Sequence, residues 1–260
     1  MTAVDTQTIH RVMHEIKRRR LQVLRVVDLT PRMRRITLGG PELAGFISLG
    51  TDDHVKLLFP QNAEQTAALE TMVLGGKNEG PMPEMRDYTP RRYDLETLEL
   101  DIDFVLHGDG PASTWAEQAT PGQFLHIGGP RGSMIVPDIF DSYLLIGDET
   151  ALPAIARRLE GMAANRKALV VIEVENGAEQ QTLESAAQVN VIWVLREGGT
   201  DNLLTTVKQL QVPKGNLYAW VATETKVSRQ IRRVLLDEHG LDDKLVKAVG
   251  YWRAEGSEEE

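Results

Sequence analysis

Alternating apolar and acidic side chains fill the run Leu98-Glu99-Leu100-Asp101-Ile102-Asp103-Phe104. Successive side chains of a strand point to opposite faces, so the apolar side chains of this run share one face and the acids share the other. That pattern predicts a half-buried antiparallel strand. Similar short strands recur between residues 21 and 136, and from them we predict an antiparallel β-barrel of about six strands over residues 18–138.

The rhythm of the sequence changes near residue 143, where apolar runs begin to alternate with stretches of helical spacing. The runs that read as buried parallel strands are 143–146, 168–174, 191–195 and 217–222. This alternation predicts a doubly wound parallel α/β domain over residues 139–253. Ligands of such a domain bind outside the carboxyl ends of the strands.

The two ends of the chain have patterns of their own. Apolar side chains recur at helical spacing in the first residues, so we predict a helical extension over residues 1–17. The basic cluster 17–20 is interpreted as the solvated end of that helix. Residues 254–260 predict an acidic, disordered tail.

Composition excludes several classes of protein. The 260 residues carry a net charge of -9, which argues against a nucleic-acid partner. The absence of cysteine excludes disulfides, thiolate zinc sites and cysteine-ligated iron–sulfur clusters, so any electron transfer needs an organic cofactor. We find no cluster with metal-ligand spacing, no run near the ~18 apolar residues of a membrane span and no signal-peptide core. We therefore expect a cytoplasmic protein without a resident metal, monomeric by default.

The segment Arg86-Asp87-Tyr88-Thr89 has the side chains that a flavin cofactor needs. On a strand, Arg86 and Tyr88 point to the same side. The planar guanidinium of arginine matches phosphate oxygens, and a tyrosine ring can lie flat on an isoalloxazine. The Thr89 hydroxyl can hydrogen-bond the edge of that ring. The segment therefore predicts a flavin site.

Further motifs follow this segment in a fixed order. They are 103–108 (DFVLHG), 110–116 (GPASTWA), 128–133 (GGPRGS), 147–154 (GDETALPA) and 250–253 (GYWR). In this order the motifs resemble the siderophore-interacting proteins, which are bacterial ferric-siderophore reductases of the ferredoxin–NADP reductase superfamily. The resemblance covers residues 18 to 253, and it implies FAD in the barrel and NAD(P)H in the α/β domain.

The resemblance implies a set of FAD-binding residues. They are Arg86, Asp87, Tyr88, Thr89, Asp103, Val105, His107, Gly110, Ala112, Ser113, Thr114, Trp115, Tyr251 and Trp252. Small residues at 112–114 would let backbone N–H groups approach the diphosphate, although Ser113 could equally be a helix N-cap. His107 could simply end a strand, and the C-terminal aromatic pair could seal an interface rather than lie near the flavin.

The predicted NAD(P)H site lies where two strands of the α/β domain end. Its residues are Gly147, Asp148, Glu149, Thr150, Pro153, Ala222, Thr223 and Glu224. Asp148 or Thr150 could cap the following helix, and the two acids 148 and 149 could contact ribose or the nicotinamide amide. Glu173 and Glu175 are acidic where a 2′-phosphate would need a cation, so NADH is slightly favoured, although Arg196 could serve NADPH.

Three cations are candidates for the acceptor site. The resemblance makes Lys56 and Lys247 candidates for binding the catecholate or carboxylate oxygens of an anionic ferric siderophore, and Arg131, in the Gly-Pro-Arg-Gly turn, is a third candidate, although each could be an ordinary solvated cation. We predict an FAD-dependent reductase that takes hydride from NAD(P)H and delivers single electrons to chelated Fe(III). The alternatives are a general flavin reductase or oxygenase reductase component, a non-catalytic siderophore carrier, and a ferredoxin in place of NAD(P)H as the donor.

Overall fold

A computed structural model describes residues 8–72, 76, 80–199 and 202–254. The chain forms two compact units, Met1–Val136 and Pro137–Glu260, so the division falls after Val136 rather than after residue 138 as predicted. The predicted acidic tail lies outside the described residues, apart from Ala254.

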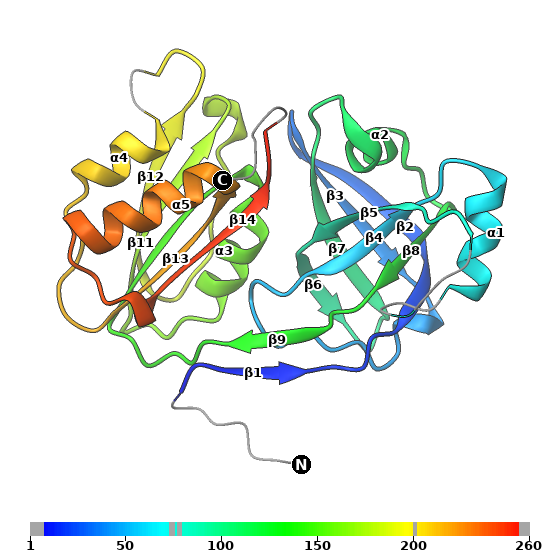
Figure 1. Cartoon of the computed structure of the whole chain (residues 1–260), viewed down its shortest axis with the longest axis horizontal. Coiled ribbons are helices and arrows are strands. Elements are labelled where there is room, and N and C mark those ends of the chain that lie inside the picture. The colour runs from blue at the N-terminus through cyan, green and yellow to red at the C-terminus, as the bar shows by residue number, and fades with distance from the viewer. Residues whose placement is uncertain (1–7, 73–75, 77–79, 200–201, 255–260) are drawn as a thin grey trace. The chain divides into compact units, whose positions relative to one another are not determined.

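The first unit is built on one antiparallel sheet of seven strands, in the order β5-β4-β8-β2-β3-β7-β6, which curls around a core (Figure 1). A separate two-stranded ribbon pairs β1 with β9. The strands are β1 (His10–Met13), β2 (Arg18–Thr30), β3 (Met33–Gly39), β4 (Val55–Phe59), β5 (Glu84–Tyr88), β6 (Pro90–Asp94), β7 (Glu99–Val105), β8 (Phe124–Gly128) and β9 (Gly132–Ile135). Among the described residues this unit also has two α-helices, α1 (Ala63–Thr71) and α2 (Gly110–Gln118), and a 3₁₀-helix, η1 (Pro41–Leu43).

The predicted strand around residue 100 is confirmed as β7. Leu100, Ile102 and Phe104 are fully buried in the core of the curled sheet. The prediction of six strands is wrong, because the main sheet has seven. The extra strand comes from the motif segment, which forms two edge strands, β5 and β6, separated only by Thr89. Polar residues on both faces of these strands hide the period-two signal.

The predicted helix over residues 1–17 is wrong for the part that the structure describes. His10–Met13 forms β1, which pairs antiparallel with β9 from His10 opposite Ile135 to Met13 opposite Gly132. The partner strand lies about 120 residues further along the chain, so local spacing cannot reveal it. The basic cluster is likewise not a helix end, because it opens strand β2.

The second unit contains a five-stranded parallel sheet in the order β12-β11-β10-β13-β14. The strands are β10 (Ser142–Asp148), β11 (Lys167–Val174), β12 (Gln188–Leu195), β13 (Leu217–Glu224) and β14 (Val246–Trp252). The α-helices described are α3 (Leu152–Glu160), α4 (Leu203–Gln209) and α5 (Thr225–Arg233), with shorter helical turns between the strands. The predicted parallel α/β unit is thus confirmed, with each predicted apolar run inside a strand.

Helices cover both faces of this sheet. Residues of α4 and α5 share a core cluster with Leu144 and Ile146 of β10. Gly147 points to the other face, where an added Cβ would lie 2.3 Å from the Cβ of Ala151 and 2.7 Å from the Ala222 carbonyl oxygen. Only glycine fits here, because η2 (Glu149–Ala151) and α3 pack directly on the strand end. Within the described part of the chain, no helix is long and apolar enough to span a membrane.

Candidate functional site

Strand β5 places Arg86 and Tyr88 on one face of the curled sheet, as predicted. The Tyr88 ring packs on Phe104, with the ring centroids 4.6 Å apart, and joins the core of the first unit. Burial raises the pKa of the Tyr88 phenol, so the ring presents a neutral hydroxyl. Arg86 lies at the exposed end of the same face, where a charged ligand can reach it.

Helix α2 begins near this strand with open backbone donors. Its N-cap residue, Asp109, makes no side-chain capping hydrogen bond. Gly110 has φ of 78°, and an added Cβ would meet no atom within 4 Å, so the backbone there is accessible. The first N–H groups of a helix attract anions when no cap satisfies them.

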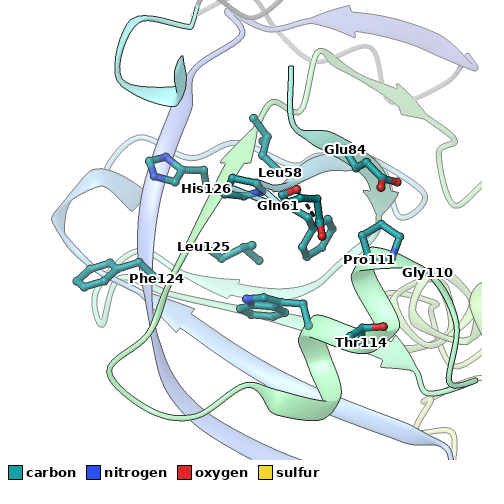
Figure 2. A pocket seen from close by; sticks show the side chains of 12 residues that line it. Leu58, Gln61, Glu84, Gly110, Pro111, Thr114, Phe124, Leu125 and His126 are labelled. Carbon is teal, nitrogen blue, oxygen red and sulfur yellow. Dashed lines mark hydrogen bonds between the residues drawn. The ribbon is translucent and has the colours of Figure 1, made fainter. Parts of the chain in front are cut away.

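A cavity of about 490 Å³ lies against this helix end. Figure 2 shows Glu84, Pro111 and Gly110 on one side of it and Phe124 and His126 on the other. The remaining lining residues are Leu58, Phe59, Pro60, Gln61, Thr114, Trp115 and Leu125. An arginine nearby, unsatisfied N–H groups and an aromatic wall fit a group with a diphosphate and flat rings, such as FAD.

Glu84, which the sequence did not predict as a site residue, both lines this cavity and binds Arg86. The Arg86 Nη2 lies 2.9 Å from Glu84 Oε2, and its Nη1 donates to the Met85 carbonyl oxygen at 2.9 Å. A phosphate at Arg86 must therefore compete with a carboxylate. Strand alternation could have found Glu84, because residues two apart on a strand share a face.

Other predicted FAD residues lie away from the Arg86–Tyr88 face. Asp87 alternates with Arg86 and pairs instead with Lys56, at 2.8 Å. Asp103 is buried on the face opposite Phe104, where Arg35 holds it through two bonds of 2.7 and 2.8 Å. Val105 is the last residue of β7. Their contact with FAD stays a prediction.

The loop before α2 is held by Ser113. The Ser113 hydroxyl is buried and accepts the backbone N–H groups of His107 and Gly108, at 3.0 and 3.3 Å. It therefore shapes the loop in front of the helix and is not the N-cap. Ala112 is buried beside it, while Thr114 and Trp115 face the cavity.

In the second unit, the Asp148 carboxylate accepts hydrogen bonds from several residues at the carboxyl edge of the sheet. The side chain is 1% exposed and accepts four hydrogen bonds. Its Oδ1 accepts from the N–H and hydroxyl of Thr150, at 2.9 and 2.5 Å, and its Oδ2 accepts from the Thr223 hydroxyl at 2.7 Å and the Trp252 indole at 2.8 Å. Asp148 thus caps the 3₁₀-helix η2, whereas α3, the helix predicted to be capped, begins after Ala151 without a side-chain cap, and Pro153 lies in its first turn as expected. Tyr251 packs edge-to-face on Trp220.

Glu149 lies beside Asp148 and is held by a cation. It receives both Nη1, at 2.7 Å, and Nη2 of Arg196, and its Oε1 also accepts the Glu175 N–H at 2.9 Å. Glu173 and Glu175 contact the same guanidinium at 3.2 and 3.4 Å. Arg196, the cation that could have read a 2′-phosphate, is therefore surrounded by three carboxylates.

Glu224 offers an acceptor at this edge. Its Oε2 caps α5 by accepting the N–H groups of Lys226 and Val227, at 2.7 and 2.9 Å. Its Oε1 is buried and has no hydrogen-bond partner among the described residues. Ala222 and Thr223 precede it and are buried. A buried carboxylate oxygen without a donor suits a ribose hydroxyl or a carboxamide N–H, so the edge fits a nicotinamide nucleotide.

The predicted acceptor cations divide between the units. Lys56 lies directly opposite Gly128 of β8, and Arg131, three residues later, is exposed although the residues between them are buried. Lys247 is half-buried on β14, in register with Trp220, in the second unit. No group of three or more His, Cys, Asp or Glu side chains able to hold a metal ion occurs within the residues described.

These features define a fold of two units, one with a curled antiparallel sheet and one with a parallel α/β sheet, and comparison with known proteins identifies the family. Residues 22–134 match the siderophore-interacting FAD-binding domain, and residues 140–255 match the siderophore-interacting protein domain. The chain therefore belongs to the siderophore-interacting protein family.

Individual relatives extend over nearly the whole chain. The NADPH-dependent ferric-chelate reductase of Escherichia coli is 38% identical over 252 residues, 94% of this chain and 96% of its own. The ferric vibriobactin reductase ViuB of Vibrio cholerae is 32% identical over 93% of this chain and 91% of its own. A siderophore utilization protein from T. fusca, solved as a crystal structure, superposes with a TM-score of 0.85 at 38% identity, covering 96% and 98% of the two chains. These findings do not support the predicted preference for NADH.

Proposed function

We propose that this protein is an FAD-dependent ferric-siderophore reductase that uses NAD(P)H as its electron donor. The observation that carries the proposal is the placement of Arg86 and Tyr88 on one face of β5, beside the uncapped start of α2 and its cavity, in a chain of the siderophore-interacting family. The names of the E. coli and V. cholerae relatives, both reductases of ferric chelates, support the acceptor class.

When bound, FAD supplies the step from two-electron hydride chemistry to one-electron reduction, so one NAD(P)H can reduce two ferric chelates. The residues of this chain bind and orient. Arg86 and the first N–H groups of α2 would hold the diphosphate, and Tyr88 and Thr89 would hold the ring system. Glu224 Oε1 would accept a hydrogen bond from the nucleotide.

The acceptor side needs only charge and access. Lys56 and Arg131 on the first unit and Lys247 on the second would attract an anionic chelate, although the whole chain carries a charge of -9. Ferric iron is the substrate, and hard oxygen donors of the chelate bind it more tightly than Fe(II), so reduction favours release. A cytoplasmic site of release belongs to the same proposal.

An anaerobic visible spectrum of the purified protein tests the proposal. We expect a flavin spectrum that bleaches on addition of NADH or NADPH and returns on addition of a ferric tris-catecholate, with Fe(II) captured by a ferrous trap. A flavin that bleaches but is not reoxidised by the chelate would assign the protein to another acceptor, such as free flavin or an oxygenase. A protein that binds no flavin would contradict the proposal and leave the siderophore carrier.

A further inference from the structure

Arg19 is a cation buried inside the first unit. Its side chain lies on the core face of β2 with Leu21 and Val23, and the residue is 5% exposed. The guanidinium carbon lies 5.3 Å from the centre of the Phe46 ring. Burial lowers the pKa of Arg19, and the negative charge of Glu42 opposes this only in part.

The hydrogen bonds of Arg19 do not compensate for this burial. Its Nη1 donates to the carbonyl oxygens of Gly129, at 3.2 Å, and Lys17, at 3.4 Å. Its buried Nε has no hydrogen-bond partner among the described residues, and no described carboxylate forms an ion pair with it. A buried charge without a carboxylate partner costs folding free energy, so stability does not explain an arginine here.

What Arg19 contacts is the turn that leads to Arg131. The turn is also held by backbone bonds, since Gly129 donates to the Lys17 carbonyl oxygen at 3.1 Å and the Arg131 carbonyl oxygen accepts from His14 at 2.9 Å. Gly129 has φ of 95°, a value that favours glycine. Arg19 is thus the one charged side chain that, among the described contacts, reaches into this turn from the core.

The same turn lies close in the fold to Lys56 and contains Arg131, the two predicted acceptor cations of the first unit. Lys56 lies opposite Gly128 in the β4–β8 ladder, and Arg131, three residues after Gly128, is exposed and has no ion-pair partner in the described chain. Shifting the Gly129 carbonyl would therefore change where Arg131 points relative to Lys56. The single Arg19 Nη1 that donates to both carbonyl oxygens ties the Gly129 carbonyl of the turn to Lys17, the residue that precedes β2.

We infer that Arg19 is a positioning residue for the substrate: it fixes the turn that presents Arg131, next to Lys56, to an anionic ferric chelate. This inference rests on the proposed function. Arg19 itself is too buried to touch the chelate, so its effect must pass through Arg131 and appear in chelate binding. Flavin binding and the reduction of the flavin by NAD(P)H should not change.

Binding of gallium(III) tris-catecholate to the FAD-loaded chain tests this without turnover, because gallium has the charge of ferric iron and is not reduced. Calorimetry would compare the wild type with Arg19→Met, Arg131→Ala and the double variant. We expect Arg19→Met to raise the Kd about fivefold, and the double variant to bind no more weakly than Arg131→Ala alone. The matched control is Arg25→Met, which removes an exposed arginine of the same strand that is paired with Glu99.

Kinetics and stability complete the experiment. With the ferric chelate, Arg19→Met should raise KM by the same factor and leave kcat unchanged, and its thermal midpoint should stay within about 3 °C of the wild type. An unchanged Kd in Arg19→Met, additive effects in the double variant, or failure of Arg19→Met to fold would each overturn the inference. A wild-type chain that binds no gallium chelate would instead overturn the proposed function, and this inference with it.

Discussion

Arg86 in the first unit and Arg196 in the second are both arginines that the sequence places where a cofactor phosphate could lie, but their surroundings differ. Arg86 is half exposed, and one exposed carboxylate, Glu84, binds it. Arg196 is two-thirds buried and is bound by Glu149, Glu173 and Glu175. The first arginine can exchange its partner for a phosphate at little cost, whereas the second has its charge already neutralised.

The pKa of Arg196 supports this difference. Burial alone would lower the pKa of the guanidinium, but the hydrogen bonds to Glu149 and the charges of Glu149 and Glu173 outweigh burial and raise it. Arg196 therefore stays charged and acts as a structural cation. The carboxylates that pack against an arginine at a strand end therefore decide its role. With few carboxylate partners the arginine can bind a ligand, and with several it stabilises the fold.

The largest effect is expected from Arg86→Ala. Loss of a guanidinium–phosphate contact should weaken FAD binding about 100-fold, because charge-assisted hydrogen bonds to phosphate are strong. The Kd is measured by the recovery of FAD fluorescence on dilution. Stability of the apoprotein should hardly change, since Arg86 is exposed. Arg25→Ala, which removes an exposed arginine paired with Glu99, is the control and should leave the Kd unchanged. Normal FAD affinity in Arg86→Ala would exclude its phosphate role.

Arg196→Met tests the other side of the comparison. Removing this cation leaves three carboxylates close together, and we expect the free energy of unfolding to fall by about 2 kcal/mol, measured by urea unfolding. Arg196→Lys should recover part of the loss. Unchanged stability at neutral pH would contradict the structural role.

Glu175→Gln tests the predicted preference for NADH, which rests only on the acids around Arg196. Glu175 is the most exposed of the three acids and the most distant from the guanidinium, at 3.4 Å. Removing its charge should strengthen binding of NADP⁺ about threefold to tenfold and leave or weaken binding of NAD⁺, in calorimetry. Glu184→Gln removes an exposed carboxylate elsewhere in the same unit as a control. Equal changes for both nucleotides would contradict a 2′-specific role for Glu175.

The parts that the sequence predicts well are those with local signals. The alternation around Leu100 predicted strand β7, and the apolar run at 143–146 predicted strand β10. The residue types at 148–150 likewise predicted the hydrogen bond from the Thr150 N–H to Asp148. In both cases side chains within a few residues of one another determine the structure, so a period or a capping pattern is enough.

The parts that it missed depend on partners far along the chain. Strand β1 exists because β9 pairs with it, and its own spacing suggests a helix. Arg19 looked like one of four solvated basic residues, but strand alternation turns it into the core, toward Gly129. Likewise the role of Arg196 depends on Glu149, 47 residues earlier. The charge and spacing of residues in the sequence indicate which residue types a site contains. Contacts between distant parts of the chain decide which of those side chains remain free to bind a ligand.

Glu84→Gln should have the smallest effect on FAD binding, and it tests how strongly Glu84 holds Arg86. The Arg86–Glu84 pair is exposed, and such pairs contribute at most about 1 kcal/mol. A carboxylate that competes with phosphate for Arg86 should therefore weaken FAD binding only modestly, and Glu84→Gln should lower the Kd about twofold to threefold. Salt screens exposed charges, so the gain should diminish at high ionic strength.

The control for this variant is Glu96→Gln, which removes one exposed negative charge of the same unit without touching Arg86. An equal gain in both variants would reflect only the reduced net charge of the protein. A loss of FAD affinity in Glu84→Gln would mean that Glu84 orients Arg86 for the phosphate rather than competing with it. Arg86 would then resemble Arg196 more closely than its exposure suggests, since both guanidinium groups would depend on carboxylates for their position.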